Sequence, residues 1–241
     1  MFLLSLAVAP GLAICLYIFF KDQYNREPRR HLIICFFLGF LSAIIALVAE
    51  ILLGKLFSHG PIDSILNTAI LAFIVVAMVE EWSKYIMVRA YAFPKPEFDE
   101  PFDGIVYAVM VGMGFATFEN IGYVMQHGFA TAIVRMFLSV PAHACFAIIM
   151  GYHMGKAKFA GPRRTLYLMK GLFWAIFWHG TFDFFLFLQE NKLIKGYTSE
   201  GLLFICALIS FFLAVRLSRI AINEHILLSR QVHEDNQRQH V

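Results

Sequence analysis

The chain has 241 residues, of which 59% are hydrophobic and 15% are charged, and its formal net charge is +3. Soluble domains carry about 25% charged residues, so this composition, with a mean hydropathy of +0.67, excludes the ordinary soluble class. The modest charge comes without an array of basic residues interleaved with aromatic ones, which argues against a nucleic-acid partner. Long apolar runs between clusters of charge are typical of a polytopic helical membrane protein.

Seven apolar stretches are long enough to cross a hydrocarbon core of about 30 Å at roughly 1.5 Å per residue. The first one has no basic n-region, contains Pro10 and lacks a clear small-residue cleavage site, so we take it as a retained helix and not as a signal peptide. The fold class that follows is an all-α membrane bundle. Its predicted spans are residues 2–20, 32–54, 65–89, 104–126, 131–155, 167–188 and 199–221.

Lysine and arginine flank these spans unevenly. Fifteen of them fall on the connections of one side and four on the other, and the bias alternates correctly through all seven spans. Because basic residues accumulate on the cytoplasmic side, we expect the N-terminus outside and the C-terminus in the cytoplasm. The chain then divides into a transmembrane domain, 1–222, and a polar cytoplasmic tail, 223–241, which we expect to be disordered or bound to the membrane surface.

The four cysteines, Cys15, Cys35, Cys145 and Cys206, each lie in an apolar run, and none forms a CxxC pair. This pattern favours thiols packed as small hydrophobic groups over a disulfide framework or a zinc finger.

Ionisable residues inside the spans are few. A charge near the bilayer centre costs at least a few kcal/mol, so it usually faces a partner or a wet cavity. Four consecutive spans carry such residues, namely Glu80, Glu119, His143 and His179. Counted from the predicted span ends, they lie about 10 to 18 Å deep. Their agreement in depth indicates one site.

Helical spacing refines this set. Glu80 and Lys84 are separated by four residues and Glu81 and Lys84 by three, so these side chains share a face. His179 and Asp183 are also four residues apart, so the carboxylate could orient the imidazole. The simpler interpretation of Glu81 and Lys84 is a neutralised pair that lets the helix enter the membrane.

Other polar residues also have simple structural interpretations. Asn120 and Tyr123 could be hydrogen-bonding contacts between helices, and His143 alone could be a packing residue. Glu50, near the outer end of its span, is expected to face solvent or lipid headgroups. Three glutamates, two histidines and one aspartate at one depth nevertheless favour a site.

Several chemistries suit this set. Glutamates in a low dielectric cannot all stay ionised, so one would hold a proton while another stays charged, giving a general acid and a general base. A carboxylate could then activate water against a peptide carbonyl, and a histidine could bind the oxyanion. Glutamate and histidine also bind Zn²⁺, although no HExxH motif is present. They also carry protons in transporters, and spacing alone leaves all three possibilities open.

The chain resembles the PrsW family of bacterial intramembrane proteases, the glutamic-type branch related to the type II CAAX prenyl endopeptidases. Four motifs on four successive spans carry this resemblance: EEWSK (80–84), FATFEN (115–120), His143, and HGTFD (179–183). Three further stretches agree with it: APGL (9–12), DQYNREP (22–28) and EPFDGIVYA (100–108).

The resemblance implies a multi-pass peptidase of the bacterial cell membrane that acts on membrane-anchored proteins. One family member makes the first cut in an anti-sigma factor, on its extracytoplasmic side, in a stress response. Glu80 and Glu81 match the paired glutamates of the family, one of them the catalytic base, and the other matched polar positions are Glu119, His143 and His179. The prenyl endopeptidases carry EExxxR and FxxxH, from which this chain departs at Lys84 and Glu119, so CAAX specificity is not expected.

We therefore interpret the chain as an intramembrane endopeptidase whose partners are the lipid bilayer and a membrane-anchored substrate, such as a single-span anti-sigma factor. Glu80 is the expected base, Glu81 and Glu119 share the remaining proton, and Lys84 balances charge. His143 and His179 bind water or the oxyanion, Asp183 orients His179, and Asn120 and Tyr123 support the site.

We expect no cofactor, with Zn²⁺ as the alternative. A metal-dependent enzyme would use Glu81, Glu119, His143 and His179 as ligands. Hydrolysis inside a bilayer also requires a hydrophilic cavity that reaches these residues. A non-catalytic scaffold or chaperone would instead satisfy them by mutual hydrogen bonds, and an ion transporter would need a path to both faces and inverted repeats.

Overall fold

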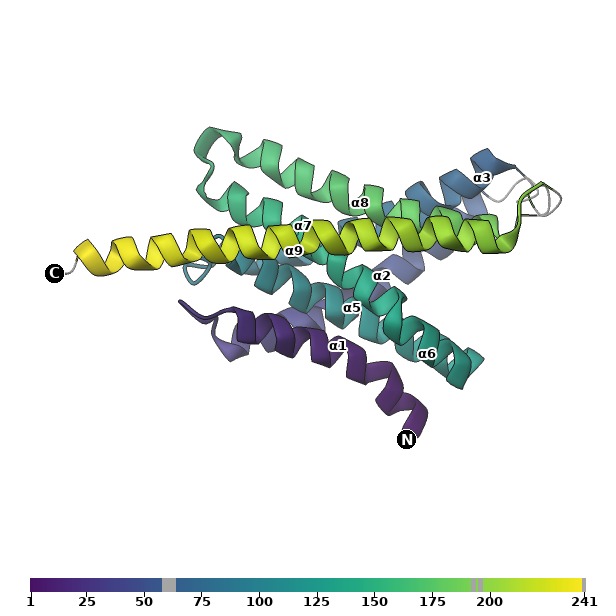
Figure 1. The fold of residues 1–241 in the computed structure, drawn as a ribbon, viewed down its shortest axis with the longest axis horizontal. Helices are drawn as coiled ribbons and strands as arrows, with labels where there is room; N and C mark the ends of the chain where they lie inside the picture. The colour runs from purple at the N-terminus through teal and green to yellow at the C-terminus, as the bar shows by residue number, and fades with distance from the viewer. Residues whose placement is uncertain (58–63, 192–193, 195–196, 240–241) are drawn as a thin grey trace.

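The structure, a computed structural model, describes residues 1–57, 64–191, 194 and 197–239, and every regular element in these ranges is a helix (Figure 1). Seven stretches are long and apolar enough to cross a membrane, which confirms the predicted fold class. The elements are α1 (Phe2–Lys21), α2 (Arg29–Phe57), α3 (Ile65–Ile70), η1 (Leu71–Ala77), α4 (Met78–Met87), η2 (Val88–Ala92), α5 (Asp103–His127), α6 (Phe129–Phe137), α7 (Ser139–Phe159), η3 (Gly161–Arg163), α8 (Arg164–Leu188) and α9 (Glu200–Gln239).

Helix α5 is the centre of the bundle. Of the 18 residues in its most apolar segment, 83% are buried inside the bundle. The helix packs most extensively against α7, α2 and α1. Glycines allow these close crossings: a Cβ on Gly39 of α2 would lie 2.8 Å from the Cα of Gly114, and one on Gly104 would lie 2.4 Å from the carbonyl oxygen of Gly151 in α7. Small residues let membrane helices approach backbone to backbone, and here they hold α5 in the position from which it presents Glu119.

The third span is one continuous helix of mixed type. Four helical elements follow one another without a break from Ile65 to Ala92, namely α3, η1, α4 and η2. Both η1 and η2 are π-helical. π-Helical turns inside α-helices occur frequently at functional sites. The α-helical segment between them, α4, carries the polar motif with four buried side chains: Glu80, Glu81, Ser83 and Lys84.

The fifth span is broken in two. Helix α6 ends at Phe137, the next residue Leu138 has a φ of −122° and a ψ of −70° that are not helical, and α7 begins at Ser139. Pro141 explains the break, because it has no N–H to donate to the carbonyl of Phe137 and its ring would clash there. At the other end, Gly128 with φ +78° separates α6 from α5. The short helix α6 therefore folds back beside α5 and α1.

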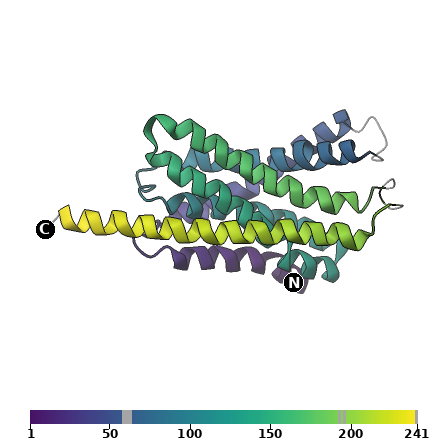
Figure 2. The same ribbon diagram turned by 45° about the horizontal axis from the view of Figure 1, so that its top comes forward.

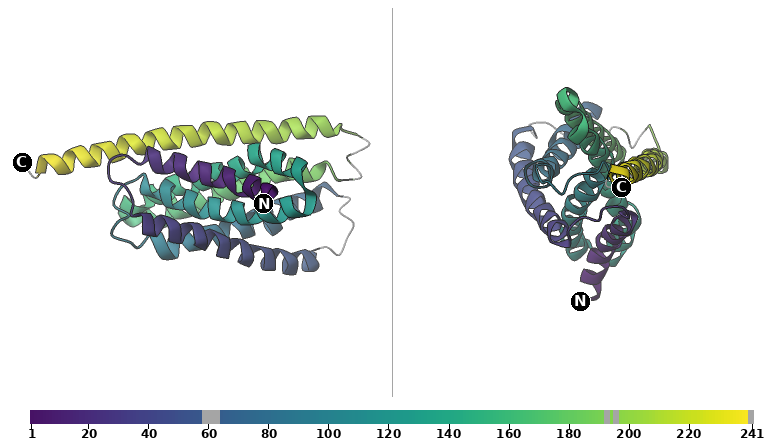
Figure 3. Two further views of the ribbon diagram at one scale, coloured as in Figure 1. Left: turned by 90° about the horizontal axis from the view of Figure 1, so that it is seen from below. Right: turned by 90° about the vertical axis from the view of Figure 1, so that its left-hand side faces the viewer.

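One end of the bundle gathers the connections from α1 to α2, from η2 to α5 and from α7 to α8, together with the C-terminal end of α9 (left in Figure 2). The distribution of basic residues predicts that this end lies in the cytoplasm. Helix α9 runs along the whole bundle and projects beyond it at this end (Figure 3).

The polar tail is helical, which corrects the expectation of disorder. Residues 223–239 continue α9 as a helix, without a break at the boundary placed after residue 222. Buried side chains at Ile222, His225 and Ser229 follow the spacing of one helix face. The His225 ring packs 4.5 Å from the ring of Tyr152 on α7. Packing of this ring on the bundle stabilises the helix at residues 223–239, although their composition is polar.

Candidate active site

Helix α4 presents two carboxylates to one ammonium. Lys84 Nζ lies 3.0 Å from Glu80 Oε2 and 2.8 Å from Glu81 Oε1, as the helical spacing predicted. All three side chains are buried, and the ring of Phe115 lies 3.8 Å from the ammonium. An ion pair this deep is stabilised only if charge and hydrogen bonds are closely matched, so these three residues form one electrostatic unit.

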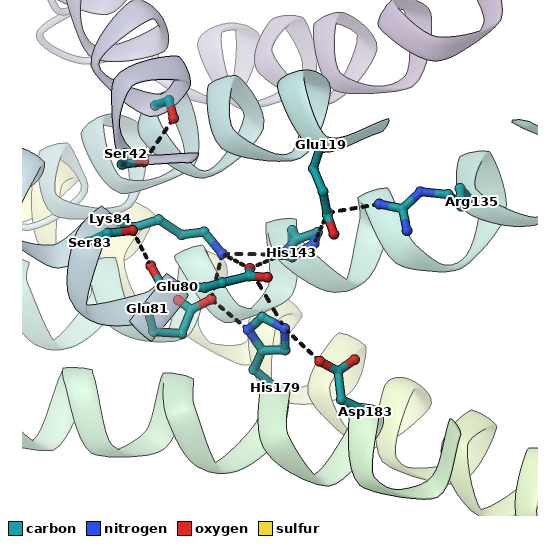
Figure 4. A network of polar contacts seen from close by, with 11 residues as sticks. Ser42, Glu80, Glu81, Ser83, Lys84, Glu119, Arg135, His143, His179 and Asp183 are labelled. Carbon is teal, nitrogen blue, oxygen red and sulfur yellow. Dashed lines mark hydrogen bonds and ion pairs between the residues drawn. The ribbon is translucent and has the colours of Figure 1, made fainter. Parts of the chain in front are cut away.

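Two histidines join α7 and α8 to this unit (Figure 4). Lys84 Nζ lies 3.3 Å from Nδ1 of His143, and Nδ1 of His179 lies 2.9 Å from Glu81 Oε1. The two imidazole rings meet edge to face at 5.1 Å. Phe146 stacks on His179 at 4.8 Å, which fixes the plane of that ring.

Two further carboxylates hold the outer nitrogens of the histidines. Glu119 Oε2 lies 3.0 Å from Nε2 of His143, and Asp183 Oδ2 lies 3.2 Å from Nε2 of His179. The second contact has the geometry expected of a carboxylate that orients an imidazole. The structure thus brings all six candidate catalytic residues, with Lys84, into one connected network across α4, α5, α7 and α8.

The supporting residues lie beside Glu119. Asn120 donates a hydrogen bond to the carbonyl oxygen of Ala7 at 2.8 Å, which ties α5 to α1. Tyr123 is partly exposed, and its ring lies 4.1 Å from the guanidinium carbon of Arg135. Asn120 is therefore an interhelical contact, whereas Tyr123 faces the open side of the site.

Arg135 is a site residue that the sequence interpretation missed. Its Nη2 donates to Glu119 Oε2 at 2.8 Å, and its Nε donates to Asn120 Oδ1 at 2.9 Å. In the sequence it counted only as one of the few basic residues on the predicted outer side. The signal that could have found it was Pro141, because a helix broken there can turn a preceding arginine toward α5.

The position of Glu50 differs from the one expected from the sequence. It lines two cavities that also reach Glu80 and Glu119, instead of facing headgroups. The reason is the length of α2: the helix continues to Phe57, so Glu50 lies about two turns inside its end at 3.6 residues per turn.

A hydrophilic cavity reaches the network, as hydrolysis inside a bilayer requires. It has a volume of about 280 Å³, and its polar lining includes Glu80, Glu119, His143, His179 and Asp183. A second cavity of about 300 Å³ shares Glu80, Glu119, Glu50 and Tyr123 with the first and extends to the exposed Gln126, near the end of α5. A water molecule occupies about 30 Å³ in the liquid, so either space accommodates several.

The two paired glutamates differ in their surroundings. Glu80 lines both of these cavities, and the Ser83 hydroxyl donates to its backbone carbonyl at 2.8 Å. Glu81 is fully buried, and its Oε2 is an interior oxygen without a hydrogen-bond partner in the described part of the chain. Of the pair, Glu80 is therefore the one placed to contact a water molecule or a substrate.

The same residues could hold a metal ion. One ligand atom from each of Glu80, Glu81, His143 and His179 lies within 4.8 Å of the others, and two carboxylates with two imidazoles suit Zn²⁺. Sequence had suggested Glu119 as a ligand, but in the structure Glu80 takes its place in the cluster. The donor types fit, yet the Lys84 ammonium already contacts three of the four residues. An ion would require that ammonium to move.

The chain is similar to several known proteases. Residues 27–215 match the family model described as PrsW family intramembrane metalloprotease. The chain is 39% identical over 189 residues to a Protease PrsW of Geobacillus kaustophilus, covering 78% of this chain and 81% of the relative. It is 35% identical over 190 residues to Protease PrsW of Bacillus subtilis, covering 78% and 84%. Protease PrsW of Clostridioides difficile is 37% identical over 194 residues, covering 78% and 80%. No solved structure gives a significant match.

Proposed function

Because the chain belongs to the PrsW family of intramembrane proteases, and is thus a multi-pass protein of a bacterial membrane, we propose that it hydrolyses its substrates with water activated by Glu80. One observation carries this proposal: Glu80 opens onto a cavity that also presents Glu119, His143, His179 and Asp183. A carboxylate beside a water-sized space at membrane depth is what general-base hydrolysis requires.

In the proposed reaction, Glu80 accepts a proton from water as the water oxygen bonds to the peptide carbonyl carbon. The carbonyl oxygen becomes an oxyanion. The oxyanion then re-forms the carbonyl as the carbon–nitrogen bond breaks, and the proton that Glu80 accepted passes to the leaving amine nitrogen. Lys84 keeps the charged carboxylates of Glu80 and Glu81 in place before the reaction, which is electrostatic preorganisation.

The histidines suit a holding role in this arrangement. Each imidazole nitrogen already contacts a carboxylate or the Lys84 ammonium, so neither ring has a spare N–H for an oxyanion unless a contact opens. Arg135 and Tyr123 line the same cavity and offer further donors. We infer that Arg135 assists the oxyanion, while His143 and His179 position the carboxylates.

A metal-dependent peptidase is the second candidate, favoured by the four clustered donors and by the name of the family model. Glu80, Glu81, His143 and His179 would hold the ion. A bound Zn²⁺ supplies a Lewis acid and a more acidic water. In that case Asp183 would orient His179 from behind, as carboxylates commonly do for ligand histidines.

For the substrate, we propose a single-span membrane-anchored protein, such as an anti-sigma factor, cut near the outer face. Glu119 and Asp183 support this location, because they lie close to the ends of α5 at His127 and of α8 at Leu188. These ends are extracytoplasmic in the predicted orientation. The cavity containing Gln126 extends toward the same side, whereas a transporter would need a path to both faces.

The proposal is tested with the purified full chain in nanodiscs and single-span membrane proteins as substrates. Wild type, Glu80→Gln and the surface control Glu234→Gln are compared with and without a chelator, and again after adding Zn²⁺. Cleavage by wild type and Glu234→Gln that is indifferent to the chelator, and absent in Glu80→Gln, supports the glutamate mechanism. Loss in the chelator with recovery in Zn²⁺ supports the metal-dependent one. Full activity of a folded Glu80→Gln contradicts both.

A further inference from the structure

Two stretches that agree with the resemblance have no part in this chemistry, and the fold brings their acidic residues together. Asp22 and Glu27 belong to DQYNREP, and Glu100 and Asp103 belong to EPFDGIVYA. All four side chains are at most 3% exposed. Asp103 precedes Glu119 by 16 positions on α5, or about 24 Å of helix. This buried acidic cluster is therefore separate from the active site, at the opposite end of the bundle.

Protein donors hold three members of the cluster, each through one oxygen. Asp103 Oδ2 accepts hydrogen bonds from the backbone N–H groups of Asp99 at 2.9 Å and Glu100 at 2.6 Å. Asp22 Oδ2 accepts one from the backbone N–H of Glu27 at 3.1 Å, and the Tyr107 hydroxyl donates to Glu27 Oε2. These bonds fix the orientations of three of the carboxyl groups.

Three carboxylate oxygens of the cluster have no hydrogen-bond partner among the described residues. Glu27 Oε1, Glu100 Oε2 and Asp103 Oδ1 are buried and accept no hydrogen bond from the described residues. Nor does any lysine, arginine or histidine in the described ranges form an ion pair with the four carboxyl groups. Arg26, which directly precedes Glu27, instead donates from Nε to the backbone oxygen of Asp22 at 3.0 Å. Buried carboxylates are costly unless something positive neutralises them.

Three of these residues also converge. One carboxylate oxygen from each of Asp22, Glu100 and Asp103 lies within 4.8 Å of the others. We propose that Asp22, Glu100 and Asp103 bind a hard divalent cation. The ligand set contains only oxygens, which suits Mg²⁺, Ca²⁺ or Mn²⁺ and disfavours metals that select nitrogen or sulfur.

Such an ion would link the connection after α1 and the connection before α5 to the start of α5. Asp22 follows α1, Glu100 lies in the connection before α5, and Asp103 is the first residue of α5. Bound to all three, the cation would hold the start of the helix whose far end carries Glu119. Protons are the competing means of neutralisation, because burial raises the pKa of Glu100 to about 7 and that of Glu27 to about 8 in the ion-free protein.

The first test counts bound ions. The full chain, in nanodiscs of neutral phosphatidylcholine, is stripped with EDTA, exchanged into Mn²⁺ and assayed for bound metal by electron paramagnetic resonance. Wild type, Glu100→Gln, Asp103→Asn and the surface control Glu234→Gln are compared with an active-site variant, Glu80→Gln with Glu81→Gln. We expect one Mn²⁺ to be lost in Glu100→Gln and Asp103→Asn and retained in the active-site variant and the control. Binding that is unchanged in both cluster variants, or lost only with the active-site pair, overturns the proposal.

The second test needs no variant to fold. The thermal midpoint of EDTA-stripped wild type is measured against Mg²⁺, Ca²⁺ and Mn²⁺ at constant pH and ionic strength. A ligand that binds only the folded state raises the midpoint progressively with its concentration, so we expect a rise for at least one of these ions. A midpoint that stays constant up to about 10 mM of all three, above the millimolar range of weak oxygen-ligand sites, and responds only to pH would assign neutralisation to protons.

Discussion

Glu81 Oε1 lies 2.9 Å from Nδ1 of His179, and this contact joins α4 to α8 inside the bundle. The same oxygen receives the Lys84 ammonium at 2.8 Å, while Glu80, one residue earlier, lines the cavities. Two adjacent glutamates thus have different surroundings: Glu81 is enclosed among structural partners, and Glu80 faces the space where water and substrate would enter. We infer from this difference that the two residues have different tasks.

Replacing Lys84 by Met should destabilise the protein strongly. The substitution leaves Glu80 and Glu81 buried without their shared counter-charge, and removing one partner of a buried ion pair costs about 3–5 kcal/mol. Unfolding by a denaturing detergent in mixed micelles would measure the loss, with Lys156→Met as the control because the Lys156–Glu224 pair is partly exposed to solvent. Equal stability of the two variants would show that the Lys84 ammonium is not needed for charge balance.

Asp183→Asn should lower kcat about 10- to 100-fold, the usual effect of removing a carboxylate that orients a functional histidine. KM should change little, because the proposed role of Asp183 is to orient His179 and not to bind the substrate. Steady-state cleavage of one single-span substrate would separate the two constants. A change confined to KM would place Asp183 in substrate binding.

Arg135→Gln should reduce kcat/KM about 10²- to 10³-fold, as is typical when one oxyanion donor is removed. The glutamine keeps some polar contact with Glu119 but loses the charge that the arginine provides. Arg230→Gln, on the exposed end of α9, is the matched control. If Arg135→Gln cleaves normally while remaining folded, the oxyanion must be bound by other donors.

Without divalent cations, the folded protein should lose stability as pH rises from about 5 to about 8. Burial raises the pKa of Asp22 from 3.8 to about 6, that of Glu100 from 4.5 to about 7 and that of Glu27 from 4.5 to about 8. A carboxyl group whose pKa is higher in the folded state contributes stability below its unfolded pKa and loses it as pH passes through the folded value. Thermal midpoints in EDTA across this range test the sign.

Glu27→Gln isolates that effect from other titrating groups. The amide cannot ionise, so the fall in midpoint with pH should be shallower in this variant than in wild type. The hydrogen bond from Tyr107 can be kept by the glutamine carbonyl oxygen, which limits other damage. A pH dependence as steep as that of wild type would remove Glu27 from the explanation.

Much of the site was predictable because it depends on local geometry. Spacing of three or four residues on a helix placed Lys84 between Glu80 and Glu81 and placed Asp183 beside His179, and matching depths brought Glu119 and His143 to the same level. These relationships require only that each span be a helix in the membrane.

The remainder depends on where helices break and end. Arg135 reaches Glu119 because the fifth span is interrupted at Leu138, and Glu50 lines the cavities because α2 continues beyond the predicted end. The acidic cluster joins Asp22 to Asp103 through folding of distant connections, for which no local spacing gives a signal. The polar end of α9 is helical because residues such as His225 pack on the bundle, which composition alone does not reveal.

We infer that Glu80 is the base and that Glu81 is its buried support. The most direct test is single-turnover cleavage of one membrane-anchored substrate by Glu80→Gln, Glu81→Gln and Glu234→Gln in the same nanodiscs, with thermal midpoints measured alongside. General-base catalysis contributes about 10²- to 10⁴-fold. We therefore predict that Glu80→Gln loses at least about 10²-fold in the chemical step with its midpoint nearly unchanged, whereas Glu81→Gln lowers the midpoint. A folded Glu80→Gln that cleaves at the rate of Glu234→Gln would contradict the account.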